Sequence, residues 1–202
     1  GGIARVAVRS SAVGEDAAGA SYAGEHDTYL ELGGRDAVAD AVYRCWASLY
    51  TARAVSYRAH AGAGPAGAMA VVVQEMVPAR AAGVFMTLNP ANGDRSTVVC
   101  EAVWGLGEPL VSGSMTPDRF VIDKVSGEVV RREVAVKARR LVRHHRYPGT
   151  TECDVPPQSR EQPCLDDAEL AELLDLARRV QRAAGVPQDG EFAVAEPGGP
   201  SR

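Results

Sequence analysis

V-A-V-R-S-S at residues 6–11 and S-Y-A-G-E-H-D-T-Y at residues 21–29 carry more structural information than any other part of the chain. The alternating valines predict a strand over residues 3–9, and residues 10–24 predict a glycine-containing loop directly after it. An arginine at a strand end, followed by hydroxyls and a glycine loop, can surround a polyphosphate with charge and N–H donors. Small polar loops are also ordinary turns, so composition alone leaves both interpretations open.

Two amphipathic helices are expected beyond this segment. Apolar residues recur at helical spacing over residues 36–60, which predicts one long helix that a glycine- and proline-containing stretch then ends. A second helix is expected from Asp166 or Asp167 to Ala184, with Gly185 as its stop.

The middle of the chain is rich in β-prone residues separated by turn signals. Residues 147–163 contain several prolines and predict a linker or surface loop. Strands are expected at residues 69–77, 83–88, 97–103, 119–124, 128–136 and 190–195.

Helices and antiparallel hairpins in separate blocks predict an α+β fold with two lobes and a ligand cleft between them. We expect residues 1–68 to form the first lobe, with the phosphate loop and the long helix. Residues 69–202 would form the second, β-rich lobe.

The bulk composition excludes several classes of protein. The chain has 202 residues, 46% hydrophobic and 24% charged, with a formal net charge of −4, which argues against a general nucleic-acid surface. The basic stretch 131–146 is interpreted as a solvated cationic face.

Four widely spaced cysteines match neither a zinc site nor a disulfide framework. No membrane span or signal peptide is evident, so a cytoplasmic protein without nucleic-acid or membrane partners is expected.

Further motifs follow the first two in a fixed order. V-R-S-S-A-V-G-E-D and S-Y-A-G-E-H-D-T-Y-L come before V-V-V-Q-E-M-V at residues 71–77, A-G-V-F-M-T-L-N-P at 82–90, E-A-V-W-G-L-G-E-P-L-V-S-G at 101–113, T-P-D-R-F-V-I-D at 116–123 and P-Q-D-G-E-F-A at 187–193. This order resembles the ATP-binding domain of the pyruvate-phosphate dikinase and phosphoenolpyruvate synthase family, which also includes rifamycin phosphotransferases. The resemblance implies an ATP-grasp-like fold, whereas a P-loop is excluded because no G-x-x-x-x-G-K-[ST] segment is present.

By this resemblance, three single residues and one connecting segment would meet the nucleotide in the first part of the chain. Arg9 would contact the ATP phosphates as the catalytic cation, and Gly24 and Thr28 would belong to the loop that closes over them. The connection Gln74 to Val77 would read the adenine edge, with Glu75 beside the base.

The resemblance also implies roles for later residues. Glu108 would accept from a ribose hydroxyl, and Glu191 would bind Mg²⁺. Gly190 stands where the family usually has a β-branched residue, which is expected to loosen the strand that aims Glu191. Lys137 is interpreted either as a phosphate contact or as a solvated lysine.

The family uses Mg-ATP to phosphorylate a carrier histidine, from which the phosphate passes to a small molecule such as pyruvate or a rifamycin. The resemblance thus implies an ATP-dependent phosphotransferase whose carrier histidine lies outside this chain, because no G-x-x-[ST]-H segment is present. The family's G-G-K and Gln-x-Arg segments are also missing, so the isolated chain is expected to be incomplete as an enzyme. The alternatives are a non-catalytic nucleotide-binding or interaction module, and a fragment or discrete subunit of a split enzyme.

Overall fold

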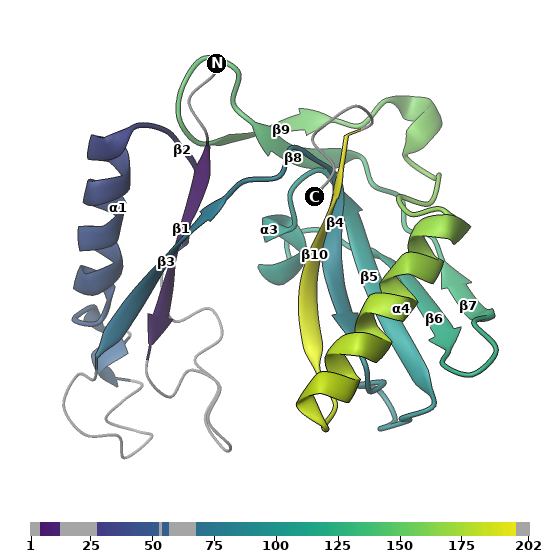
Figure 1. Ribbon diagram of the computed structural model, residues 1–202. Coiled ribbons are helices and arrows are strands. Elements are labelled where there is room, and N and C mark those ends of the chain that lie inside the picture. The colour runs from purple at the N-terminus through teal and green to yellow at the C-terminus, as the bar shows by residue number, and fades with distance from the viewer. Residues whose placement is uncertain (1–4, 13–27, 53, 57–67, 197–202) are drawn as a thin grey trace. The chain divides into compact units, whose positions relative to one another are not determined.

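The computed structural model describes residues 5–12, 28–52, 54–56 and 68–196 (Figure 1). The chain divides into two compact units. The first comprises Gly1–Met76 with Arg143–Thr150, and the second comprises Val77–Val142 with Thr151–Arg202. None of the helices in the described residues is both long and apolar enough to cross a membrane.

The first unit is built on a three-stranded antiparallel sheet. Strands β1 (Val6–Ala12), β2 (Thr28–Leu32) and β3 (Met69–Glu75) lie in the order β2-β1-β3. The sequence division places β3 in the second lobe, but β3 pairs with β1 along its full length. Such a pairing joins residues far apart in the chain and cannot be read from local patterns.

Helix α1 (Arg35–Ser48) packs on one face of this sheet. Val8 of β1 meets Ala41 and Cys45 of the helix in a small buried cluster. The expectation of one continuous helix over residues 36–60 is wrong, because a turn follows α1 at residues 49–51 and helical structure returns at residues 52 and 54–56. Thr51 explains the break: its Oγ1 accepts from the backbone N of Ala54 at 3.3 Å, as helix-capping threonines do.

The second unit contains a five-stranded antiparallel sheet in the order β10-β4-β5-β6-β7. The alternation of apolar residues predicts most of these strands correctly. Their bounds are Ala79–Met86 for β4, Thr97–Trp104 for β5, Asp118–Asp123 for β6, Val129–Glu133 for β7 and Asp189–Ala195 for β10.

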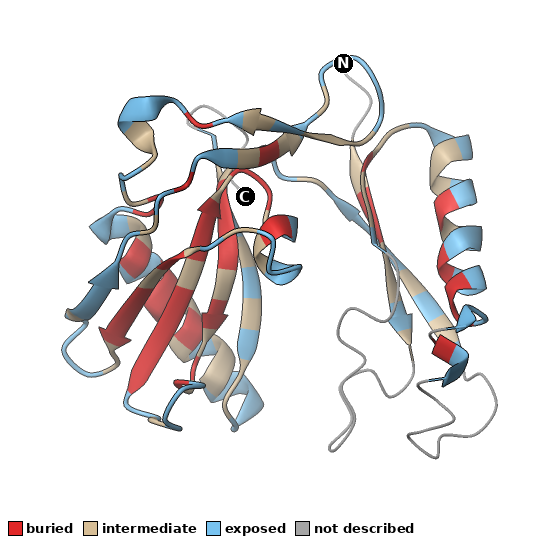
Figure 2. Ribbon diagram, turned by 180° about the vertical axis from the view of Figure 1, so that it is seen from behind, coloured by how far each residue is buried: buried red, intermediate tan, exposed pale blue. Residues whose placement is uncertain are grey.

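Helix α4 (Asp167–Ala184) covers one face of this sheet. Its predicted ends are confirmed. Asp166 and Glu169 form a capping box at the start, and Gly185 ends the helix with a φ of 73°, a left-handed conformation that glycine adopts at little cost. Figure 2 shows the buried residues concentrated on the sheet and on the side of α4 that meets it, where the main core lies.

The interpretation of residues 147–163 as a linker or surface loop is wrong for residues 150–154, which form a strand. Strand β9 (Thr150–Asp154) pairs with β8 (Arg139–Arg143) in a separate two-stranded sheet, and a 3₁₀ turn, η1, follows at Pro157–Ser159. Arg139 forms ion pairs with Glu152 at 3.3 Å and with Asp154 at 3.4 Å. Acidic partners therefore accompany the basic stretch 131–146.

Lys137 is neither a phosphate contact nor a solvated lysine. Its ammonium is buried in the second unit, where it pairs with the Asp118 carboxylate and donates to the Ala135 carbonyl at 2.9 Å. Asp118 also accepts from the backbone N of Ala135 at 2.9 Å and of Cys164 at 2.8 Å. The pair therefore holds the irregular segments around Ala135 and Cys164 against the start of β6.

The α+β class with antiparallel sheets is confirmed by these elements. The ATP-grasp-like arrangement of two lobes around a nucleotide cleft stays a prediction. None of the four cysteines, all of which lie in the described residues, forms a disulfide.

Candidate functional site

Arg9 lies in the middle of β1 on the face of the sheet opposite α1. Neighbouring residues of a strand point to opposite faces, and Val8 points toward the helix. Arg9 is opposite Thr28 of β2 and opposite Val72 of β3. Two residues that the motif order assigns to phosphate binding are therefore direct cross-strand neighbours.

The segment 74–77 is exposed except for Met76, which is half-buried. Gln74 is opposite Ala7 and so shares the face of Arg9, whereas Glu75 is opposite Val6 on the other face. The backbone N of Met76 donates to the Arg5 carbonyl at 2.8 Å, which extends the pairing beyond the strand. Val77 is the first residue of the second unit.

Three members of the predicted nucleotide site, Arg9, Thr28 and Gln74, thus share one face of the first unit's sheet. Arg9 is half-buried, and Thr28 and Gln74 are exposed. Gly24, together with His26 and His60, lies outside the described residues. Thr28 belongs to β2 rather than to a loop, because the strand begins at this residue.

Glu191 lies in β10 with its side chain exposed. The register places Glu191 opposite Val84, Val84 opposite Glu101, and Glu101 opposite Arg119. Phe85, the neighbour of Val84, belongs to the core under α4, so this row runs across the face away from that helix.

The row contains an ion pair that the sequence does not reveal. The Arg119 guanidinium donates to the Glu101 carboxylate at 3.2 Å, and both side chains are partly exposed. Alternation along β5 places Glu101 on this face, but its alignment with Glu191 requires the register of three strands. The pair adds a guanidinium and a second carboxylate to the same surface as Glu191.

Gly190 does not loosen β10, contrary to expectation. A Cβ at this position would lie closer than 3.0 Å to the ring of Phe85, its cross-strand partner. The aromatic ring occupies the space above the glycine, and the strand continues without a register shift through Glu191. A β-branched residue here would collide with the core.

Glu108 is the first residue of the short helix α3 (Glu108–Val111), and its side chain is exposed. A Cβ on the preceding Gly107 would lie 3.5 Å from the Cβ of Ala82. Ala82 is two residues from Val84, so it lies on the same face of β4. The G-L-G-E turn thus reaches the side of the sheet on which Glu191 lies.

The described residues hold no group of three or more His, Cys, Asp or Glu side chains that could bind a metal by themselves. A Mg²⁺ ion bound through nucleotide phosphates usually takes one or two carboxylates and completes its shell with phosphate and water oxygens. Glu191 has the appropriate chemistry for one such ligand.

Other residues of the family motifs have packing or turn roles. Trp104 donates from Nε1 to the Ser159 carbonyl at 3.2 Å and packs against the core. Thr87 is buried and accepts from the backbone N of Gln188 at 2.6 Å. Asn89 accepts from the backbone N of Ala91 at 3.1 Å. Trp104 is therefore a packing residue, and Thr87 and Asn89 shape the connection between β4 and β5.

Comparison with protein families shows which family the chain belongs to. The model of the pyruvate phosphate dikinase AMP/ATP-binding domain matches residues 2–200. The chain belongs to this family. Family membership makes ATP the expected ligand of the residues described above.

Curated relatives agree with this assignment. The chain is 43% identical over 192 residues to a probable phosphoenolpyruvate synthase of Methanothermobacter thermautotrophicus, covering 95% of this chain and 28% of that protein. It is 44% identical over 193 residues to a rifampicin phosphotransferase of Streptomyces sp, covering 95% of this chain and 22% of that protein. The phosphoenolpyruvate synthase of Pyrococcus furiosus is 39% identical over 194 residues, with 93% and 24% covered. The chain therefore spans about a quarter of the length of these relatives.

Proposed function

We propose that this chain is the ATP-binding portion of a phosphoenolpyruvate synthase-like phosphotransferase. Mg-ATP would phosphorylate a carrier histidine outside this chain, and the phosphate would pass to a small molecule such as pyruvate or a rifamycin. The observation that carries the proposal is the placement of Arg9, Thr28 and Gln74 on one face of a family-matched sheet. That face presents a guanidinium, a hydroxyl and an amide in neighbouring register positions.

Each residue has a separate chemical task in this proposal. The Arg9 guanidinium donates to phosphate oxygens and balances their charge, because its planar fork matches their geometry. The Thr28 hydroxyl donates to a neighbouring phosphate oxygen. The Glu191 carboxylate holds the metal, which supplies neutralisation of the charge on the transferring group. Backbone groups of the connection 74–77 pair with the adenine edge, beside Glu75 and Val77, and Glu108 accepts from the ribose.

The first prediction concerns Arg9. Replacing it by alanine should weaken ATP binding about tenfold to a hundredfold, because a charge-assisted contact is worth roughly 1.5–3 kcal/mol. Calorimetry with ATP, GTP and pyrophosphate at constant ionic strength measures the change. Arg35→Ala is a matched control, because Arg35 is an exposed residue at the start of α1 in the same unit. An equal loss in both variants would reduce the site to a generic anion patch.

The second prediction concerns Glu191. Mg²⁺ should strengthen ATP binding by the unmodified chain, and this gain should fall about tenfold in Glu191→Gln, which keeps the size of the side chain but removes its charge. Titrating ATP with and without Mg²⁺ separates metal binding from nucleotide binding. Glu128→Gln, in the exposed turn after β6, serves as the control for the lost charge. Identical Mg²⁺ dependence in the unmodified chain and in Glu191→Gln would remove Glu191 from the metal site.

A further inference from the structure

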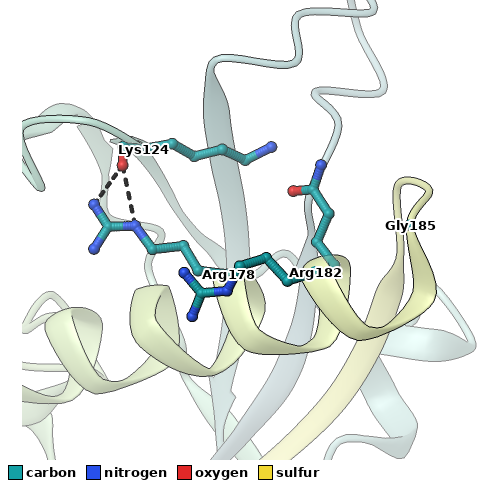
Figure 3. Close-up of a pocket in the computed structure, with 5 residues that line it drawn as sticks. Lys124, Arg178, Arg182 and Gly185 are labelled. Carbon is teal, nitrogen blue, oxygen red and sulfur yellow. Dashed lines mark hydrogen bonds between the residues drawn. The ribbon is translucent and has the colours of Figure 1, made fainter.

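A second cationic site lies in the second unit beside the C-terminal half of α4. A pocket of about 380 Å³ lies there, and Figure 3 draws the residues that line it. Three cationic side chains, one amide and one glycine line it: Lys124, Arg178, Arg182, Gln181 and Gly185. No carboxylate is among the lining residues.

The backbone holds two of the three cations in place. The Lys124 ammonium donates to the carbonyls of Thr87 and, at 2.7 Å, of Arg95. The Arg178 guanidinium donates twice to the Lys124 carbonyl, as the dashed lines in Figure 3 mark. These contacts order both side chains before a ligand arrives, which lowers the entropy cost of binding.

Both cations retain unused donors. An ammonium has three N–H groups and a guanidinium has five. Lys124 uses two of its donors on carbonyls, so one remains. Arg178 uses two on the Lys124 carbonyl and one on the Asp175 carboxylate at 3.1 Å, so two remain. The Arg182 side chain has no hydrogen bond or ion pair with any residue that the structure describes.

The nearby carboxylates are engaged elsewhere. Asp94 accepts from Ser96 at 2.8 Å, and Asp123 accepts from the backbone N of Val125 and Ser126 at 2.8 Å each. Burial is the main cause that lowers the pKa of Lys124; the charge of Asp94 opposes this shift, and the charge of Arg95 adds a smaller lowering. The ammonium has therefore lost part of its hydration, and an anion in the pocket would compensate that loss.

The pocket is separate from the surface assigned to the nucleotide. Three of its lining residues belong to α4, which packs on the core face of the sheet. Glu191 lies in the strand row on the opposite face. A ligand in the pocket and a metal at Glu191 thus lie on different sides of the same sheet.

We propose that this pocket binds a compact anion bearing one or two phosphate groups, of the size of inorganic phosphate or pyrophosphate. Unused N–H donors of Lys124, Arg178 and Arg182 provide charge-assisted hydrogen bonds to its oxygens. The volume is near the lower end of the range for small-molecule sites, roughly 300–1,000 Å³, which suits a small anion better than a nucleotide. The proposal of this site rests on these contacts and does not depend on the function proposed above.

The test is a titration of the whole chain with inorganic pyrophosphate at fixed ionic strength. Binding is measured by calorimetry and by the change in the backbone amide signal of Gly185. Arg182→Gln should weaken this binding about tenfold, the loss of one charge-assisted contact. Arg179→Gln is the matched control, because it removes the same charge from an exposed neighbour on α4 that does not line the pocket. That control should change the affinity less than twofold.

Arg9→Ala separates this site from the nucleotide surface. Pyrophosphate should still shift the Gly185 signal of this variant with unchanged affinity, even where ATP binding is weakened. Phosphate and pyrophosphate are also compared, since a pocket for one phosphate group would bind both with similar affinity. Equal losses in Arg182→Gln and Arg179→Gln, a loss in Arg9→Ala, or the absence of saturable binding would each overturn the proposal.

Discussion

Replacing Lys137 by methionine is expected to lower the free energy of unfolding by about 3–5 kcal/mol, since breaking a buried ion pair leaves an uncompensated charge. The Asp118 and Lys137 side chains are 0% and 2% exposed. Methionine fills nearly the same volume as lysine, so packing changes little and the loss reports on the charge. Urea denaturation measures the change, with the slope m checked for constancy because the chain has two units.

The size of this effect follows from what remains around Asp118. Its two backbone donors, the N–H groups of Ala135 and Cys164, stay in place but do not neutralise the carboxylate. Burial, with the charge of Asp118 as the next cause, raises the pKa of the Cys164 thiol far above its ordinary range, so this neighbour stays neutral. No described contact would replace the lysine charge.

Two further variants make the Lys137 prediction specific. Arg139→Met removes an exposed cation from the same region, and its ion pairs with Glu152 and Asp154 should contribute no more than about 1 kcal/mol. Adding Asp118→Asn to Lys137→Met removes the stranded charge and should restore part of the lost stability. A loss in Lys137→Met no larger than that in Arg139→Met would show that the buried pair is not a main determinant of stability.

Local signals in the sequence predict α4 almost to the residue. Asp166, Glu169 and Gly185 each act within one helical turn, so the cap and the stop are visible without any tertiary information. The break after α1 is less visible, because the residues beyond it keep helical spacing. Thr51 overrides that pattern through one side-chain hydrogen bond to Ala54.

The features that the sequence misses depend on pairing between distant segments. Strand β9 contains mostly polar residues, and its pairing with β8 defines it more than its own apolar pattern does. Lys137 is read as a solvated or ligand-binding cation because its partner, Asp118, lies 19 residues earlier. The ion pair between Lys137 and Asp118 can be recognised only when the fold brings these two side chains together.

The same distinction applies to the candidate site. Motif order identifies Arg9, Thr28 and Glu191 as separate positions, and the sheet register then makes the first two neighbours. The register also aligns Glu101 and Arg119 with Glu191, a row that no single motif contains. The motifs therefore indicate which functional groups are available, whereas strand pairing determines which of these groups can act on one ligand.

Replacing Gly83 by alanine is expected to destabilise the second unit by about 3 kcal/mol or more, at the upper end of the cost of overpacking. A Cβ at this position would lie closer than 3.0 Å to the Glu101 carbonyl oxygen and 2.9 Å from the Cα of Ala102. Both obstacles are backbone atoms of β5, the partner strand of β4. A side chain can rotate away from a new methyl group, but a central strand must shift as a whole.

The shift should also reach β10, which carries the proposed metal ligand Glu191, because Gly83 is opposite Phe192, the neighbour of Glu191. We expect Gly83→Ala to weaken the effect of Mg²⁺ on ATP binding as well as stability. Gly113→Ala is the control: its φ is 70° and nothing lies within 4 Å of its Cβ, so it measures only the cost of a left-handed backbone, roughly 1–2 kcal/mol. Urea denaturation and Mg²⁺-dependent ATP titrations of both variants give the comparison. Equal stability losses, or a normal Mg²⁺ response in a folded Gly83→Ala chain, would show that β4 and β5 can separate without moving Glu191.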